Sequence, residues 1–219
     1  EVYSSGRLSR LYLRDYAEET EAWLADFATR HTAQEALEAL DSLKGLRVAV
    51  ISDNVEDTLY TVDQLSTIPG HGHVLLALQI ADQTVMRGAM QIMQAQATAL
   101  GCDVTPMAPV RFGGAGYVDR RGVGILQTYA ALTPEQREDS KRSIRQAVAR
   151  LTEPPELVLI ADYGTGALEP SVLLAIGGFN AVTTPANAIN YPRDVLGSYH
   201  GVSAWFANEF EWAMRGDVI

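Results

Sequence analysis

The segment from Glu156 to Gly166 constrains the fold of this chain more than any other part of the sequence. It reads Glu-Leu-Val-Leu-Ile-Ala-Asp-Tyr-Gly-Thr-Gly, an apolar run that ends on a carboxylate and a glycine-rich turn. Such runs are typical of strands buried on both faces of a parallel sheet. Because ligands bind at the carboxyl ends of strands in open α/β sheets, Asp162 and the turn after it mark a candidate site.

Segments of strand character and of helix character alternate from Leu46 onward. We expect helices between strands over 46–52, 73–80, 103–110, 124–130, 157–161 and 179–184. The alternative for 73–80 is the start of one long helix, and the strand is preferred. Repeated strand-helix-strand units favour parallel strands joined by right-handed crossovers. The sequence therefore predicts an α/β fold with a doubly wound, mostly parallel sheet of five or six strands.

The helix predictions depend on apolar spacing and on capping residues. The spacing of Val55, Leu59, Val62 and Leu65 predicts a helix after the first strand. A second helix is expected from the N-cap Asp82 to Gly101. Thr133, Pro134 and Gln136 form the clearest start signal, for a helix that ends near Leu151. Further helices are expected over 171–176 and 202–214.

Residues 1–45 are expected to form a helical N-terminal extension that precedes an α/β core domain, 46–219. Apolar residues recur at three- and four-residue spacings from Leu8 through Tyr16 to Phe27. Thr32 and Glu35 form a capping-box pattern for a second helix, which would turn Leu37, Leu40 and Leu43 inward. No low-complexity linker separates this extension from the core domain.

Composition excludes some classes of partner. With 27 acidic and 17 basic residues the net charge is −10, which argues against nucleic-acid binding and against binding to an anionic membrane. Cys102 is the only cysteine, so no intrachain disulfide forms. We expect a cytoplasmic protein, although the chain begins at Glu1 without a methionine, as a processed or shortened chain would.

Three further segments are candidates for ligand contact at the same edge as Asp162, Gly164, Thr165 and Gly166. Ser52, Asp53 and Asn54 follow the first core strand, where hydroxyl and backbone N–H groups can hold an anion. The nearby Glu56 and Asp57 would repel that anion unless a divalent cation bridged them, and the alternative role of Ser52 or Asp53 is a helix cap. Arg111 opens a glycine-rich loop that lets backbone approach a ligand, or that is simply mobile. Thr183 and Thr184 end a later strand.

The Asp-Tyr-Gly-Thr-Gly segment resembles the first strand of the glutamine amidotransferase subunit of histidine biosynthesis, over about Leu157 to Ile189. That resemblance implies a catalytic cysteine elbow and a downstream His-x-Glu, and this sequence has neither. No Gly-x-Ser-x-Gly nucleophile elbow occurs, and the negative charge of Asp103 beside Cys102 disfavours a reactive thiolate. The sequence assigns no catalytic residue, metal or cofactor.

Two classes of function follow from these patterns. The first is a small-molecule-binding domain that holds a phosphorylated or carboxylated metabolite at the carboxyl edge of the sheet. The alternative is a non-catalytic assembly subunit that forms a homo-oligomer or binds a protein partner through its N-terminal and C-terminal helices. The aromatic residues of the C-terminal segment, Trp205, Phe206, Phe210 and Trp212, support the second class.

Overall fold

The computed structural model describes residues 18–68, 71–109, 111, 113–122, 124–129, 131–187 and 189–215. It divides into two compact units, one ending at Lys44 and one running from Gly45 to Ile219. Within the described ranges, every helix is too short or too polar to cross a membrane.

The first unit contains helices α2 (Glu18–Arg30) and α3 (Ala33–Asp41). Thr32 caps α3 as predicted: its hydroxyl accepts from the Glu35 backbone N–H at 3.1 Å, and Glu35 Oε2 accepts from the Thr32 N–H at 2.7 Å. Leu37 and Leu40, which were expected to turn inward, are exposed, and no residue of α3 is buried. The pattern predicted over Leu8–Tyr16 lies outside the described residues.

The second unit contains two sheets and four α-helices among its described residues. In chain order its elements are β1 (Arg47–Ser52), β2 (Glu56–Ile68), β3 (His71–Arg87), α4 (Ala89–Ala99), β4 (Asp103–Met107), β5 (Gly114–Val118), β6 (Gly124–Tyr129), α5 (Pro134–Ala149), β7 (Leu157–Ala161), α6 (Pro170–Leu174), β8 (Phe179–Thr183), the 3₁₀ turn η1 (Leu196–Ser198), β9 (Ala204–Phe206) and α7 (Glu209–Ala213).

The larger sheet confirms the predicted fold class. It has five strands in the order β4-β1-β7-β8-β9, and every neighbouring pair is parallel. The chain passes from β1 outward to β4, returns through α5 to β7 on the other side of β1, and continues outward to β8 and β9. Such a path, which starts at a central strand and extends in both directions, is that of a doubly wound sheet.

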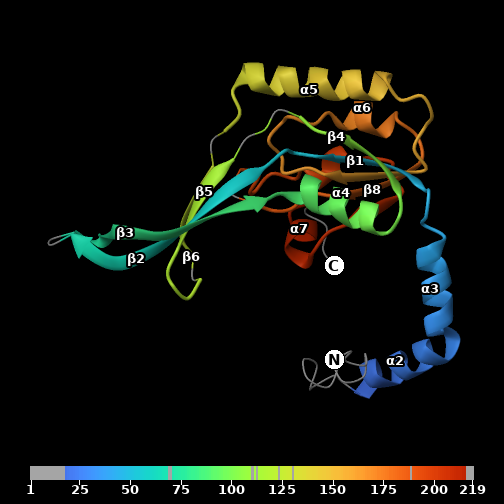
Figure 1. Cartoon of the computed structure of the whole chain (residues 1–219), viewed down its shortest axis with the longest axis horizontal. Helices are drawn as coiled ribbons and strands as arrows, with labels where there is room; N and C mark the ends of the chain where they lie inside the picture. Colours follow the sequence, from blue (N-terminus) through green and yellow to red (C-terminus); the bar gives the residue numbers. More distant parts are fainter. Residues whose placement is uncertain are drawn as a thin grey trace. The chain divides into compact units, whose positions relative to one another are not determined.

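Helices cover both faces of this sheet (Figure 1). Alternate residues of β1 point to opposite sides, so Ala49 and Ile51 pack with Ile144 of α5 and Leu173 of α6. Val48 and Val50 pack on the other face, against Met90 of α4. The apolar sequence of β1 is thereby explained, since this strand is buried on both faces and at both edges.

A second sheet, with the order β3-β2-β5-β6, corrects three of the predictions. The segment after β1 is strand β2 and not a helix, because Thr58, Tyr60, Thr61 and Val62 favour the extended backbone that pairs with β3. The predicted strand over 124–130 exists as β6, yet it pairs antiparallel with β5 outside the parallel sheet. Part of the loop predicted after Arg111 is strand β5.

The start of α4 also differs from the prediction. Asp82 is not an N-cap, since it lies opposite Thr61 in the β2–β3 ladder. The strand continues to Arg87, and Gly88 is the N-cap, without a side-chain hydrogen bond. In contrast, Thr133 caps α5 as predicted, with a reciprocal pair of hydrogen bonds to Gln136 of 2.9 and 3.2 Å.

The C-terminal segment is not the single helix expected over 202–214. Residues Ala204–Phe206 form β9 at the edge of the parallel sheet, and α7 begins only after Asn208. Asn208 and Glu211 form a capping box that fixes this start. Aromatic residues at 205 and 206 favour a strand, and tertiary pairing with β8 outweighs their helical spacing.

Candidate functional site

The candidate site lies where the carboxyl ends of β1 and β7 meet. These strands are neighbours, with Ser52 paired to Ala161, and Asp53 and Asp162 directly follow them. From this point the chain leads outward from β1 toward β4 but from β7 toward β8, on the opposite side. A crevice between two strands whose connections diverge in this way is the usual ligand site of open α/β sheets.

Asp53 joins the end of β1 to the turn after β7. Its carboxylate accepts hydrogen bonds from the Tyr163 backbone N–H at 2.7 Å and from the Thr165 hydroxyl at 2.5 Å. The side chain is fully buried. Both carboxylate oxygens are therefore engaged in holding the turn, so Asp53 is suited to positioning rather than to direct contact with a ligand.

Asp162 anchors the same turn from its first residue. Its backbone N–H donates to Thr183 O at 3.0 Å, and its Oδ1 accepts from the Gly164 N–H at 2.7 Å. Its Oδ2 accepts from the hydroxyl of Tyr199 at 2.8 Å. Asp162 and Tyr199 are both buried, so this carboxylate is shielded from water on the side of η1.

The two carboxyl groups affect each other's protonation. Burial, followed by the negative charge of Asp162, raises the pKa of Asp53 to about 7. Burial also raises the pKa of Asp162, against the hydrogen bonds from the Gly164 N–H and from Tyr199 and the charge of Arg193. The pair thus keeps a proton at a pH where a solvated aspartate has lost it.

The turn that these carboxylates fix forms one wall of a cavity. Gly164 and Gly166 have φ angles of +73° and +81°, which side chains rarely adopt, and a Cβ on Gly164 would lie 2.6 Å from Asn190 Cβ. The cavity has a volume of about 210 Å³ and is lined by Gly164, Thr165, Arg137 and Arg193 together with Ala131, Leu132 and Ile189.

Arg137 and Arg193 bring positive charge to this cavity from α5 and from the segment before η1. Arg137 Nε and Nη2 donate to Leu132 O at 3.2 and 3.1 Å, and an N–H of Arg193 donates to Gly164 O. Each guanidinium has five N–H donors, so others remain available. Within the part of the chain that the structure describes, neither arginine forms a salt bridge with a carboxylate.

The structure brings some of the predicted site residues together and separates others. Asp53, Asp162, Gly164, Thr165 and Gly166 belong to one cluster. The Ser52 hydroxyl donates to Asp53 O at 3.1 Å, beside that cluster. The Asn54 side chain has other partners: its NH₂ donates to Pro109 O at 3.4 Å, and its Oδ1 accepts from the Gln91 amide at 3.0 Å.

Arg111 is not part of the cluster, because its guanidinium pairs with Glu56 at 3.2 Å. Sequence reasoning missed Arg137, Arg193 and Tyr199, which come from segments distant along the chain. In the sequence, Arg137 is followed by Glu138 and Asp139, and a helix face of mixed charge is usually solvated. Among the described residues, no three His, Cys, Asp or Glu side chains are grouped as a metal site would require.

A second cavity, of about 420 Å³, follows the carboxyl ends of β8 and β9. Asn187, Tyr191, Asn208, Phe210 and Glu211 line it with Ala186. Asn187 connects it to the Asp162 turn by donating to Tyr163 O at 3.0 Å. Both cavities therefore flank the segment that follows β8.

No protein-family model matches this sequence. No curated protein matches it either. Solved structures with a similar fold include a carbohydrate kinase from Agrobacterium tumefaciens, with 15% identity, a TM-score of 0.48, and coverage of 77% of this chain and 62% of that chain.

Two nucleoside kinases are also similar. The Methanocaldococcus jannaschii enzyme, an archaeal member of the ribokinase family, has 11% identity and a TM-score of 0.42, with 78% of this chain and 63% of that chain covered. The Burkholderia thailandensis enzyme in complex with inosine has 10% identity and a TM-score of 0.33, with 62% and 52% covered. The chain spans about three fifths of the length of the first solved structures it matches. These identities and TM-scores are too low to carry a substrate or a reaction over to this chain.

Proposed function

We propose that this chain binds a small anionic metabolite, phosphorylated or carboxylated, at the carboxyl edge of its parallel sheet. The observation that carries the proposal is the cavity where Arg137 and Arg193 meet the Gly164–Gly166 turn. In a chain with a net charge of −10, two arginines without a described salt bridge favour an anion from outside the protein. The Thr165 hydroxyl lines the same cavity.

The size of the cavity limits what it holds. Pockets for whole drug-sized ligands measure roughly 300–1,000 Å³. At about 210 Å³, this cavity suits the anionic group itself, with the rest of the metabolite outside it. A phosphate or a carboxylate can accept paired N–H donors from guanidinium groups, which fixes its orientation.

Electrostatics of the buried pair support the same ligand class. Two ionised carboxylates beside the turn would repel an anion. Because burial raises the pKa of Asp53 to about 7, the Asp53–Asp162 pair retains a proton near neutral pH and that repulsion is reduced. Their hydrogen bonds to Tyr163, Gly164 and Thr165 also hold the turn in place before a ligand arrives.

The test is calorimetric titration with inorganic phosphate, ribose 5-phosphate and citrate, with ribose and inosine as uncharged probes. We expect at least one anion to bind and to lose about tenfold or more of its affinity in Arg137→Gln and in Arg193→Gln. Arg142→Gln is the matched control, because Arg142 is exposed on the same helix and pairs with Asp139. The proposal fails if the uncharged probes bind as tightly, or if the control variant weakens binding equally.

A second candidate function is that of a non-catalytic assembly subunit. Tyr191, Phe206 and Phe210 are 58%, 63% and 54% exposed, and Tyr191 stacks on Phe210 with ring centroids 5.5 Å apart. Exposed aromatic groups of this kind are enriched at protein interfaces. Light scattering distinguishes this candidate: a defined oligomer that dissociates in Phe206→Ser with unchanged anion affinity supports assembly through this segment.

A further inference from the structure

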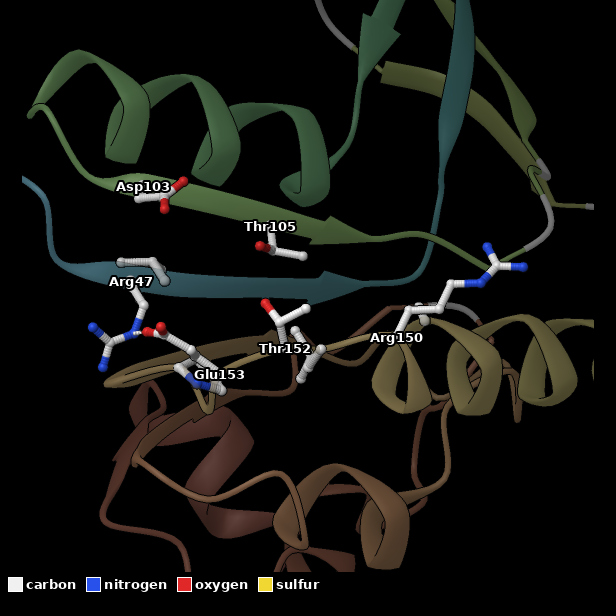
Figure 2. A pocket seen from close by; sticks show the side chains of 10 residues that line it. Arg47, Asp103, Thr105, Arg150, Thr152 and Glu153 are labelled. Carbon is white, nitrogen blue, oxygen red and sulfur yellow. Dashed lines mark ion pairs between the residues drawn. The ribbon is translucent and has the colours of Figure 1, made fainter.

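A cavity of about 530 Å³ lies at the amino edge of the parallel sheet, at the opposite end of the strands from Asp162. It lies between the first residues of β1 and β4, where Arg47 pairs in register with Asp103, and the segment that joins α5 to β7. Figure 2 shows Thr105 and Thr152 in its middle, with Arg47 and Glu153 toward one end and Arg150 at the other. Nothing in the proposed function uses this cavity.

The wall formed by β4 is polar where a helix-facing strand is usually apolar. Asp103, Thr105 and Met107 point to the same face of the sheet because side chains alternate along a strand. Met107 is fully buried with Ile144 of α5, whereas Asp103 and Thr105 are exposed. The last residues of α5 therefore border the amino half of β4 without filling the space beside it.

Some polar side chains of the cavity already have partners in the protein, and others do not. Arg47 is fixed: its Nε lies 3.2 Å from Pro154 O and 3.6 Å from Glu153, and its Nη1 lies 3.5 Å from Glu156. The side chains of Asp103, Thr105, Arg150 and Thr152 form no hydrogen bond or salt bridge with any described residue. One carboxylate, one guanidinium and two hydroxyls that have no partner among the described residues thus line the cavity.

An added β-strand is excluded as the occupant by the backbone of β4. The Asp103 N–H donates to Leu46 O at 2.9 Å, so the N–H groups of residues 103 and 105 point toward β1. Residues 104 and 106 face the open edge, and Pro106 has no N–H. A polypeptide strand would find too few donors there, which argues against β-strand addition at this edge.

We propose that this cavity binds a small zwitterion whose ammonium and carboxylate groups lie several bonds apart, such as a dipeptide or an ω-amino acid. Asp103 binds the ammonium group, Arg150 binds the carboxylate, and the Thr105 and Thr152 hydroxyls bind polar atoms between them. Asp103 and Arg150 lie toward different ends of the cavity in Figure 2, which is why the charges must be separated. The volume is within the roughly 300–1,000 Å³ of small-molecule sites.

The experiment is calorimetric titration of the full chain with glycylglycine and γ-aminobutyrate. Glycine tests the need for charge separation, and butyrate and butylamine each carry only one of the two charges. We expect the three comparison compounds to bind about tenfold or more weakly, because each loses a charge-assisted hydrogen bond. Asp103→Asn and Arg150→Gln should weaken glycylglycine binding by a similar factor.

Asp139→Asn and Arg142→Gln are matched controls on the exposed face of α5 and should leave binding unchanged. Amide chemical-shift mapping on the unaltered chain provides a second measurement that needs no variant, with shifts expected at Asp103, Thr105 and Thr152. The proposal is overturned if neither glycylglycine nor γ-aminobutyrate binds, or if butyrate binds equally well. It is also overturned if the shifts cluster around Gly164 or if Arg193→Gln abolishes binding, because the ligand would then occupy the carboxyl edge.

Discussion

The Thr165 hydroxyl donates a hydrogen bond of 2.5 Å to Asp53 Oδ1, and the two residues are 112 positions apart in sequence. Together with the 2.7 Å bond from the Tyr163 N–H, it fixes the turn after β7 to the end of β1. The position of the arginine-lined cavity therefore depends on a carboxyl group that does not line it.

Asp53→Ala should destabilise the chain at pH 6. Alanine has no side-chain acceptor, so the Tyr163 N–H and the Thr165 hydroxyl both lose the partner that Asp53 gives them. Each buried donor left without a partner costs about 1–3 kcal/mol. Urea unfolding measures the change in the free energy of unfolding. The control is Ser52→Ala, a buried change at the same edge that removes only a hydrogen bond to Asp53 O. It should lower the free energy of unfolding by less.

Stability of the unaltered chain should fall as pH rises from about 4 to about 7. The pKa of Asp53 is raised to about 7 by burial and by Asp162, so the folded state binds more protons than the unfolded state in this window. The contribution of one such group is about 1.4 kcal/mol per pH unit. Urea unfolding at a series of pH values should show this slope level off above pH 7. A slope that persists unchanged in Asp53→Asn would contradict the assignment.

Tyr199→Phe should lower stability by about 1–3 kcal/mol, because it removes the 2.8 Å hydrogen bond to Asp162 inside the core. It should also steepen the loss of stability with rising pH, since that bond opposes the rise in the pKa of Asp162. Tyr191→Phe serves as the control, because that side chain is 58% exposed. Thermal and urea unfolding of both variants provide the comparison.

Thr133→Ala should affect both stability and anion binding. The N-cap hydroxyl accepts from the Gln136 N–H at 3.2 Å, and its loss costs about 0.5–2 kcal/mol. Arg137 lies in the same first turn of α5, so fraying there displaces a guanidinium from the cavity. Calorimetry should show weaker anion binding in Thr133→Ala. Thr133→Ser keeps the capping hydroxyl and should bind the anion as tightly as the unaltered chain. Unchanged affinity in Thr133→Ala would show that the cap is not needed to hold Arg137 in the cavity.

The parts of the fold that were predicted correctly have local causes. The apolar run of β7 and the caps of α3 and α5 each act within a few residues, so the sequence shows them directly. The segment after β1 was misread because apolar spacing alone did not separate helix from strand. Its pairing with β3 decided the outcome, and that pairing is a tertiary effect.

The candidate site divides in the same way. Asp162 and its glycine turn follow a recognisable strand, so their place at the sheet edge was predictable. Arg193 and Tyr199 reach that edge from a segment with no marked pattern, through contacts with Gly164 and Asp162. Arg111 was expected at the same edge. The chain after it forms β5, which pairs with β2 in the second sheet, and the Arg111 guanidinium forms an ion pair with Glu56.

The strand order has a consequence for how the molecule acquires its structure. The interior strand β1 pairs with β4 and β7, whose partners for Val48 are Val104 and Leu157. Both pairings require long loops to close before any strand-strand contact compensates for the lost chain entropy. We therefore expect slow folding, in which the hydrogen bond between Asp53 and Thr165 forms late. A chain synthesised only as far as α5 should have neither the Gly164–Gly166 turn nor the arginine-lined cavity beside it.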